Sequence, residues 1–390
     1  MDLKFRYLTQ SILEDLKEKM VFLGGPRQVG KTTLATDLIA KHFKNAYYNW
    51  DKISQRREAL SGHWPAEAEL IILDEFHKHA KWKTWIKGEY DTGKKHHNFL
   101  LTGSARLNIF RRGGDSLQGR YHYYRLHPFS CAELAGSLSQ SKPGTELNFS
   151  TSFSSTDFDL LLVYGGFPEP LIRQSAKTLR RWHQERMERL IREDIRDLTQ
   201  IQDIGNLNLL AELLPEKVAS ILSINSLARD LQVNFRTVAN WLDAFEEFFY
   251  CFRLASFQSK KIAAVKKEKK AYLWDWSQIQ NPGARLENLV ASHLLKFCHY
   301  LHDHEGQPVT LHYVRDSTGR ELDFLVCLNN KPWFAVEVKS QDRVISLPLL
   351  YFREKLNIPY CYQVTTSPNE DTFKNGVRIL SAPKFLSALV

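Results

Sequence analysis

A short glycine-framed segment near the start of the chain constrains its fold more than any other feature. It has the pattern G-x-x-x-x-G-K-[ST], and its residues are Gly25, Pro26, Arg27, Gln28, Val29, Gly30, Lys31 and Thr32. Such a loop wraps backbone N–H groups around a polyphosphate and must join a strand to a helix. The apolar run 20–23 before it and the helical spacing from Thr33 onward meet that condition.

The residue types in this loop predict how a nucleotide is held. Backbone N–H groups of residues 25–33, except Pro26, which has none, are expected to cradle the phosphates, with Thr33 closing the set. Lys31 is long enough to reach the β- and γ-phosphates, and Thr32 offers a hydroxyl to Mg²⁺. The pattern therefore predicts ATP and Mg²⁺ as cofactors.

Two carboxylates follow the apolar run 70–73. A buried parallel strand has this appearance, and its carboxyl end lies where α/β sheets bind ligands. We expect Asp74 to hold Mg²⁺ through water and Glu75 to polarise the attacking water. A further apolar run, 99–102, leads to Ser104, whose hydroxyl could sense the γ-phosphate. Strands and helices that alternate in this way predict a doubly wound parallel α/β sheet.

Composition limits the class of protein. A length of 390 residues predicts two or three domains, and a net charge of +9 favours a polyanionic partner. No apolar run approaches the roughly 18 residues of a membrane span, and the first residues lack the apolar region of a secretion signal. The five cysteines are scattered and form no C-x-x-C, so neither disulfides nor zinc are expected. We therefore expect a cytoplasmic protein with no membrane partner.

The middle of the chain is expected to be helical and to contact DNA. A long polar helix is predicted over 178–200. Two helical segments around the turn 232–234 predict a helix-turn-helix, and residues 249–254 could form a strand of a wing. The lysine-rich run 260–270 then suggests phosphate contacts. The alternative is a solubilising loop, or a winged helix that only packs inside a larger ATPase.

Carboxylates in the last third follow an order used by metal-dependent nucleases. Glu287 lies in a predicted helix over 284–297, and Asp323 lies in a predicted strand over 321–327 that begins with acids. Glu337 and Lys339 are two apart on the next strand, so their side chains share one face, and a hairpin would bring Asp323 beside them. Two or three carboxylates could hold Mg²⁺ or Mn²⁺, and Lys339 could orient a water. The alternative is an exposed strand pair that binds nothing.

These residues belong to segments that together resemble a known family. The chain resembles bacterial and archaeal AAA+-type P-loop ATPases whose C-terminal domain of unknown function is similar to a PD-(D/E)XK nuclease. The segments are GGPRQVGKTTL, YYNWD, LIILDEFHK, LLTGSARL, SLQGR, YGGFPEP, LIREDIRDLTQ, KAYLWD, GARLENLVASHLL, RELDFLV and FAVEVKS. They lie in order across nearly the whole chain.

The resemblance implies four parts. They are a P-loop ATPase core over 1–136, a helical lid or linker region over 157–214, a winged-helix-like domain over 215–272 and a restriction-endonuclease-like α/β domain over 273–390. It also implies that Arg120 could act as an arginine finger or sensor, with Arg106, Arg111 and Arg112 as alternatives. Self-association into an oligomer or ring is a further implication.

Three functions remain open on the sequence. The first is an ATPase that couples ATP turnover to DNA processing, with possible metal-dependent cleavage. The second is an ATP-dependent switch that holds DNA or a protein, with an inactive C-terminal domain. The third is a chaperone-like ATPase that acts on protein. Asp74 and Glu75 argue against a pure binding module, and the full set of C-terminal acids argues against a relic.

Overall fold

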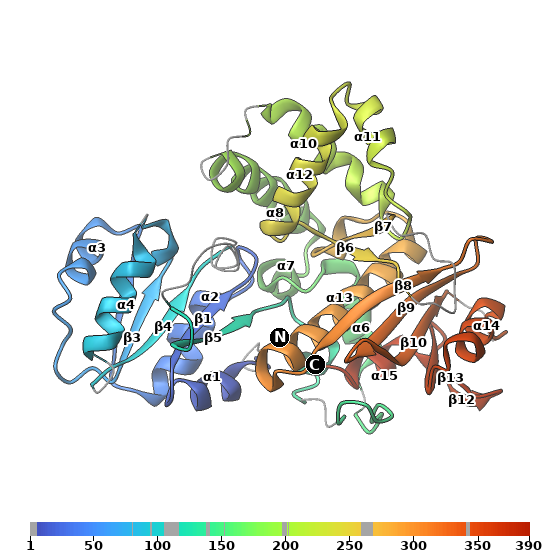
Figure 1. The fold of residues 1–390 in the computed structure, drawn as a ribbon, viewed down its shortest axis with the longest axis horizontal. Coiled ribbons are helices and arrows are strands. Elements are labelled where there is room, and N and C mark those ends of the chain that lie inside the picture. The colour runs from blue at the N-terminus through green and yellow to red at the C-terminus, as the bar shows by residue number, and fades with distance from the viewer. Residues whose placement is uncertain are drawn as a thin grey trace. The chain divides into compact units, whose positions relative to one another are not determined.

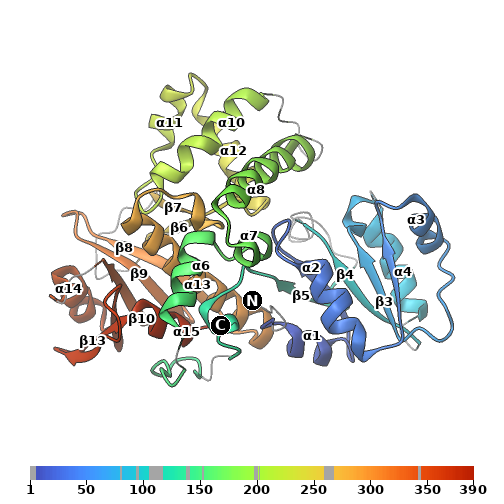
Figure 2. The same cartoon turned by 180° about the vertical axis from the view of Figure 1, so that it is seen from behind.

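The chain forms two compact units, Met1–His127 and Pro128–Val390, which are described one at a time. The computed structural model describes residues 6–79, 81–93, 96–104, 117–137, 141–151, 153–196, 201, 203–258, 268–340 and 344–390. Figures 1 and 2 show the elements of both units. The finer division into four parts stays a prediction.

The first unit is built on a sheet of five parallel strands. In sequence they are β1 (Met20–Gly24), β2 (Asn45–Asn49), β3 (Leu70–Asp74), β4 (Asn98–Thr102) and β5 (Tyr121–Arg125). Their order across the sheet is β2-β3-β4-β1-β5, and every pairing is parallel. Strands β1 and β3 are buried at all five positions, as expected of runs covered on both faces. The predicted parallel α/β sheet is confirmed.

Helices cover both faces of this sheet. The P-loop runs into α2 (Lys31–Thr33), which continues without a break as the π-helical η1 (Leu34–Ile39) and the 3-10 η2 (Ala40–His42). Figures 1 and 2 show this segment on one face and α4 (Trp82–Gly93) on the other. The remaining helices of the unit's described part are α1 (Thr9–Asp15), α3 (Ile53–Leu60) and the 3-10 η3 (Phe76–Lys78). Trp82 and Ile86 of α4 pack on Phe22 in the core.

Strand β5 was not expected from the sequence. Its residues, Tyr-His-Tyr-Tyr-Arg, lack the apolar run that marks the other strands, and only Tyr124 is buried. It nevertheless pairs with β1 along its whole length. A strand at the edge of a sheet is covered on fewer sides, so its composition carries a weaker signal.

The second unit begins with helices. They are α5 (Cys131–Leu134), α6 (Ser155–Tyr164), α7 (Pro168–Arg173), α8 (Ala176–Arg189), the π-helical η5 (Leu190–Ile195), α10 (Ile204–Leu213), the 3-10 η6 (Leu214–Lys217), α11 (Ile224–Asp230) and α12 (Phe235–Glu247). Ser175 caps α8, which starts two residues earlier than predicted and gives way to η5. Ser223 and Asn234 cap the starts of α11 and α12 through their side chains, and Asn234 ends the short turn between the two helices.

A two-stranded hairpin follows α12. It pairs β6 (Cys251–Ala255) with β7 (Lys269–Leu273) in antiparallel register. The two helices and the strand at 249–254 therefore lie close to where the sequence placed them. Whether they form a winged helix stays a prediction. The 3-10 η7 (Trp276–Gln278) leads from the hairpin to the last part of the chain.

The last part is a mixed sheet of six strands in the order β12-β13-β11-β10-β9-β8. The strands are β8 (Val309–Arg315), β9 (Glu321–Leu328), β10 (Lys331–Lys339), β11 (Tyr360–Thr365), β12 (Asp371–Lys374) and β13 (Val377–Ser381), and the helices are α13 (Pro282–Glu305), α14 (Leu347–Leu356) and α15 (Ala382–Ser387). The predicted hairpin is the β9–β10 pair. Its turn places Asn329 and Asn330 at φ 53° and 60°, a conformation that asparagine tolerates well.

Helices α13 and α14 pack on opposite faces of this sheet. Phe297 of α13 contacts Phe334 with ring centroids 6.4 Å apart, whereas Phe352 of α14 packs in the core with Ala335. Neighbouring residues on a strand point to opposite faces, so Phe334 lies on the face that α13 covers and Ala335 on the face that α14 covers. The sheet is thus a covered layer, which explains the apolar runs of β9 and β10.

Two expectations from composition can be compared with the structure. All five cysteines are buried and unbonded. Across the segments that the structure describes, no helix combines the length and the apolar character that a membrane crossing needs.

Candidate functional site

The P-loop follows β1 in a conformation that demands glycine. Gly25 has φ 149°, and a Cβ atom on it would lie 2.5 Å from the backbone oxygen of Leu126 at the end of β5. Gly30 has φ 97° and caps the start of α2. Both positions lie in the region that L side chains avoid, so the glycines of the pattern are fixed by backbone geometry.

Lys31 and Thr32 lie at the start of the helix that follows the loop. The buried Lys31 ammonium donates hydrogen bonds to the carbonyls of Gly25 (3.0 Å) and Pro26 (2.8 Å). The loop therefore curls around a positive charge at a helix N-terminus, an arrangement that fits a polyphosphate. Of the other predicted loop residues, Val29 is buried, Gln28 is left-handed at φ 60°, and Thr33 is exposed in α2 next to Thr32; Arg27 is half-buried.

The Asp74 carboxylate accepts hydrogen bonds from three hydroxyl groups. Thr32 Oγ1 and Tyr47 Oη donate to Oδ2 at 2.9 and 2.7 Å, and Thr102 Oγ1 donates to Oδ1. These hydroxyls come from α2, β2 and β4, which all reach the carboxyl edge of the sheet. Asp74 is thereby oriented toward Thr32, the other predicted magnesium ligand. The pair fits a divalent cation, because Mg²⁺ prefers carboxylate, hydroxyl and water oxygens.

Glu75 turns out of the strand at its very end. It has φ 57°, and its N–H donates to the Thr102 carbonyl at 3.1 Å. Burial raises the pKa of the Glu75 carboxyl, against the lowering effect of Lys31 and Lys78. A carboxylate with a raised pKa is a stronger base toward water, which suits the predicted role of Glu75.

The side chain of His77 lies between Ser104 and Glu75 and is close to both. The Nε2 atom of His77 is 3.6 Å from Glu75 Oε2 and 3.3 Å from Ser104 Oγ. His77 is buried, so it links the ends of β3 and β4 inside the unit. The predicted base and the predicted sensor are therefore neighbours in one small polar group.

Arg120 lies elsewhere in the first unit. Its Nε and Nη2 atoms donate to the Asp91 carboxylate of α4 at 2.7 and 3.1 Å. This bidentate pair raises the pKa of Arg120 and gives it a partner within its own unit. Arg106, Arg111 and Arg112 lie outside the described residues. The finger or sensor role stays a prediction.

Three residues of this site were missed by sequence reasoning. Thr102 and His77 lie next to predicted features, at the end of the 99–102 run and two residues beyond Glu75. Tyr47 lies in a strand that pairs with β3, and its hydroxyl also accepts a hydrogen bond from Asn49 at 3.2 Å. The available signal was a polar residue at the carboxyl end of a strand, which Thr102 satisfies. Tyr47 gave no such signal.

A second group of charged side chains lies in the second unit, around Lys270 of β7. The Lys270 ammonium is 2.6 Å from Glu321, 3.3 Å from Glu287 and 3.7 Å from Asp323. Tyr272 Oη also donates to Glu287 at 2.9 Å. Burial alone would lower the pKa of Lys270, but the three carboxylates raise it. We call Glu287, Glu321 and Asp323 the acid cluster.

Glu337 and Lys339 adjoin this cluster. Glu337 accepts a hydrogen bond from Ser346 at 2.9 Å and pairs with Lys339 at 2.9 Å, and its other oxygen lies 3.4 Å from the Asp323 N–H. The hairpin thus brings Asp323 and Glu337 together, as its expected register requires. Burial and repulsion by Asp323 raise the pKa of Glu337 to about 7 and that of Glu287 to about 8.

The metal site expected here does not appear as a ready-made ligand set. Among the residues that the structure describes, no group of three or more His, Cys, Asp or Glu side chains is spaced to hold a metal ion. The Lys270 ammonium already lies beside two of the three expected ligands, Glu287 and Asp323. Their role as metal ligands, and that of Lys339 in cleavage, stay predictions.

Lys270 also corrects the interpretation of the lysine-rich run. As part of 260–270 it was expected to contact DNA phosphates, but it is 1% exposed and ion-paired. Residues 270–273 of β7 are all buried, whereas Lys269, at the start of the strand, is exposed. Residues 260–267 lie outside the described part of the chain.

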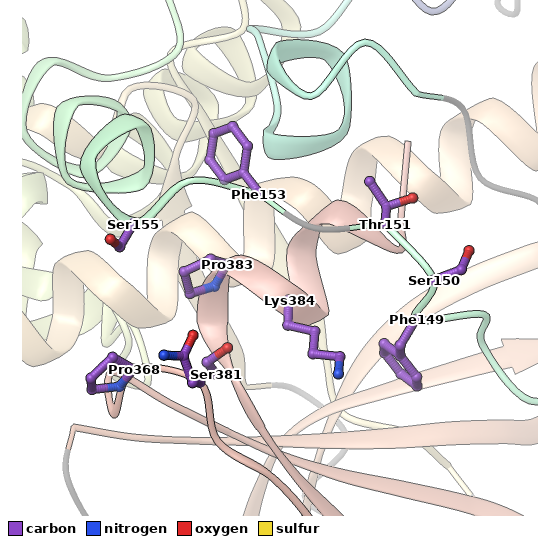
Figure 3. Close-up of a pocket in the computed structure, with 10 residues that line it drawn as sticks. Phe149, Ser150, Thr151, Phe153, Ser155, Pro368, Ser381, Pro383 and Lys384 are labelled. Atoms are coloured by element: carbon purple, nitrogen blue, oxygen red, sulfur yellow. The ribbon is translucent and has the colours of Figure 1, made fainter.

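A cavity of about 350 Å³ in the second unit shares no lining residue with the acid cluster. Figure 3 shows Phe149, Phe153 and Ser155 from one segment facing Pro383 and Lys384 across it. Lys384 is the charged residue of its lining, and that ammonium pairs with Asp371 at 2.6 Å. The cavity therefore brings together no set of side chains with evident chemistry.

Comparisons with known proteins divide the chain into three. Residues 17–135 match a family described as an AAA domain. Residues 155–279 and 282–385 match two families described only as domains of unknown function. An uncharacterized protein of Methanocaldococcus jannaschii is 23% identical over 363 residues, which are 85% of this chain and 79% of the relative. An uncharacterized protein of Mycobacterium tuberculosis is 22% identical over 341 residues, 82% of this chain and 70% of the relative.

Solved structures give weaker likenesses. A Walker-type ATPase of Pyrococcus abyssi has a TM-score of 0.39 and 12% identity, covering 71% of this chain and 93% of its own. The Aeropyrum pernix ORC1 protein, solved in complex with DNA, has a TM-score of 0.29 and 12% identity, covering 73% and 90%. Likeness at this level assigns no function. The segment 17–135 is thus similar in sequence to AAA domains, and its parallel sheet and its P-loop agree with that match.

Proposed function

We propose that this chain binds ATP with Mg²⁺, hydrolyses it in the first unit and holds DNA with the second. The observation that supports hydrolysis is that two differently placed acids at the end of β3 lie beside the helix that follows the P-loop. Asp74 is fixed by hydroxyls toward Thr32, whereas Glu75 turns aside with a raised pKa. A domain that only binds nucleotide does not need the second acid, because Glu75 is proposed to act on the attacking water.

Each side chain has a distinct task in this proposal. Lys31 offsets charge on the β- and γ-phosphates, and Thr32 and Asp74 hold the metal. The Mg²⁺ ion supplies further neutralisation of the phosphate oxygens. Glu75 polarises the attacking water, and Ser104 senses the γ-phosphate through the polar group that it shares with His77.

The most direct test is ATP turnover by the purified chain, with and without DNA. We expect Mg²⁺-dependent hydrolysis that DNA accelerates. Turnover that DNA leaves unchanged, together with no DNA affinity at low salt, would favour the chaperone-like alternative. Nucleotide binding without any turnover would favour the switch.

Tyr47→Phe is expected to raise the Mg²⁺ concentration that half-saturates turnover about tenfold. The change removes a hydrogen bond to the charged Asp74 carboxylate, and such bonds contribute about 1.5–3 kcal/mol. Titration of ATPase activity with Mg²⁺ at fixed ATP measures the effect. Tyr48→Phe is the matched control, because Tyr48 is the next residue of β2 and packs on Trp64. Equal Mg²⁺ curves for the two variants would contradict the role of Tyr47.

DNA binding is supported by the net charge of +9 and by the exposed basic residues of the region after α10. Arg229 and Arg236 are exposed on α11 and α12, and Lys269 is exposed on β7. The proposal assigns this region phosphate contacts, with the sequence preference left open.

Affinity for DNA is expected to fall steeply with salt. Each phosphate contact contributes a slope of about −0.9 in log K against log salt, so neutralising Lys266, Lys267 and Lys269 should flatten it by up to about 2.7. Fluorescence anisotropy at several salt concentrations measures the slope. A control triple of exposed lysines in the first unit, Lys17, Lys41 and Lys52, should leave it unchanged. Equal slopes for both triples would place the DNA contacts elsewhere.

Two finer parts of the proposal rest mainly on the family resemblance. One is self-association into an oligomer or ring, which an arginine finger acting in trans would need. The other is metal-dependent cleavage by Asp323, Glu337 and Lys339. Because Lys270 lies among the acids, we propose cleavage only for a state in which that ammonium has left the cluster.

A further inference from the structure

The acid cluster already has a cation. Lys270 is 1% exposed, and its ammonium lies within 3.7 Å of all three carboxylates. Carboxylates are almost never buried unless they are paired, and here one amine serves three of them. The neighbouring Glu337 has its own cation in Lys339.

Lys270 is held in this position from both sides. Its strand pairs with β6 in register Leu254↔Lys270. Farther along the strand, the Leu273 N–H donates to Asn288 Oδ1 of α13 at 2.7 Å, and Asn288 Nδ2 donates back to the Leu273 carbonyl at 2.7 Å. Asn288 follows Glu287 directly, so the same contact fixes the lysine strand and one acid of the cluster relative to each other.

A divalent metal and this ammonium cannot share the cluster. Metal–oxygen distances for Mg²⁺ and Ca²⁺ are about 2.0–2.6 Å, so an ion bound by Glu287 and Asp323 would lie close to the Lys270 nitrogen. Two like charges at that separation repel strongly where little water screens them. The cluster as it stands therefore does not fit the metal that the family resemblance implies.

We propose that Lys270 is the resident cation of the acid cluster and that it excludes divalent metal ions from it. The inference deepens the conditional cleavage step of the proposed function, because it names the group that must leave. Because Lys270 belongs to β7, the position of the β6–β7 hairpin then decides whether the cluster can bind a metal ion.

Binding of Mn²⁺ to the full chain tests this, by calorimetry without nucleotide. All variants carry Asp74→Asn, so that the first unit contributes no metal site. Lys270→Met keeps the length of the side chain and removes its charge, and it is expected to bind one Mn²⁺ at least about tenfold more tightly than the chain with Lys270. Adding Asp323→Asn to Lys270→Met should remove that gain. Lys331→Met, on the exposed start of β10, is the matched control and should gain nothing.

Two outcomes would overturn the proposal. One is Mn²⁺ binding by the chain with Lys270 that is as tight as in Lys270→Met and is lost in Asp323→Asn. The other is a folded Lys270→Met variant with no gain in affinity. If Lys270→Met does not fold, Lys270→Gln takes its place in both comparisons. Because no nucleotide or DNA is present, failure of the ATPase or of cleavage would leave this result unaffected.

Discussion

Replacing Glu75 with glutamine is expected to lower kcat for ATP about 10²–10⁴-fold while leaving ATP binding intact. The loss is that of a positioned group that accepts a proton from water. Glutamine keeps the size of the side chain, so the αL turn at φ 57° and the contact of its N–H with Thr102 should persist. Steady-state turnover and equilibrium binding of a fluorescent ATP analogue separate the two effects.

Lys31→Ala is the comparison for this experiment. Because Lys31 offsets phosphate charge in the bound state, its loss should abolish binding as well as turnover. Turnover by Glu75→Gln that matches the unaltered chain would remove Glu75 from the site. A loss of binding in Glu75→Gln would show that the side chain acts on the nucleotide or on the fold.

Replacing Asp275 with alanine is expected to lower the free energy of unfolding by about 3–5 kcal/mol, because it leaves the buried Arg186 guanidinium without its acid. Asp275 is 1% exposed, lies 3.1 Å from His183 Nε2 and 3.9 Å from Arg186 Nη1, and accepts from Ser277. Arg186 is itself buried and would keep an uncompensated charge. Urea unfolding followed by circular dichroism gives the difference.

An exposed acid supplies the control. Asp371→Ala removes the same charge from a pair with Arg378 and Lys384 at the surface, and should cost less than about 1 kcal/mol. If both changes lower the free energy of unfolding equally, burial of Asp275 would add nothing to its contribution to stability.

Lowering the pH should reduce the difference in the free energy of unfolding between Asp275→Ala and the unaltered chain. Burial acts to raise the pKa of Asp275, but its bonds and charges with His183 and Arg186 dominate and hold the pKa at about 2. A carboxyl whose pKa is depressed in the folded state stabilises the fold at pH values above its ordinary pKa. That contribution is lost as the pH falls from about 4 toward 2.

The local parts of the first site could be predicted from sequence. The strand–loop–helix of the P-loop and the two acids after β3 depend on short-range patterns, and the structure places them together. What brings Tyr47 to Asp74 is the pairing of β2 with β3, which depends on strand order rather than on any local motif. Strand β5 was missed because its polar aromatic residues carry no apolar run.

In the acid cluster, too, the local structure could be predicted from the sequence and the tertiary packing could not. The hairpin that joins Asp323 to Glu337 follows from strand periodicity and a short turn. Lys270 was interpreted as a surface residue because it ends a run of lysines, and a charge run is usually solvated. Its burial depends on the packing around β7, which is buried from Lys270 to Leu273, and the run of lysines carries no local signal of where that burial begins.

The burial of all five cysteines makes the chain well suited to site-specific spectroscopy. Burial raises the pKa of the Cys131, Cys251, Cys327 and Cys361 thiols, and it raises those of Cys327 and Cys361 to about 12. Since the thiolate is the reactive form, the native thiols should resist maleimide reagents as long as the chain is folded. A cysteine introduced at Val344, which is 74% exposed, would then carry a single dye without removal of any natural residue.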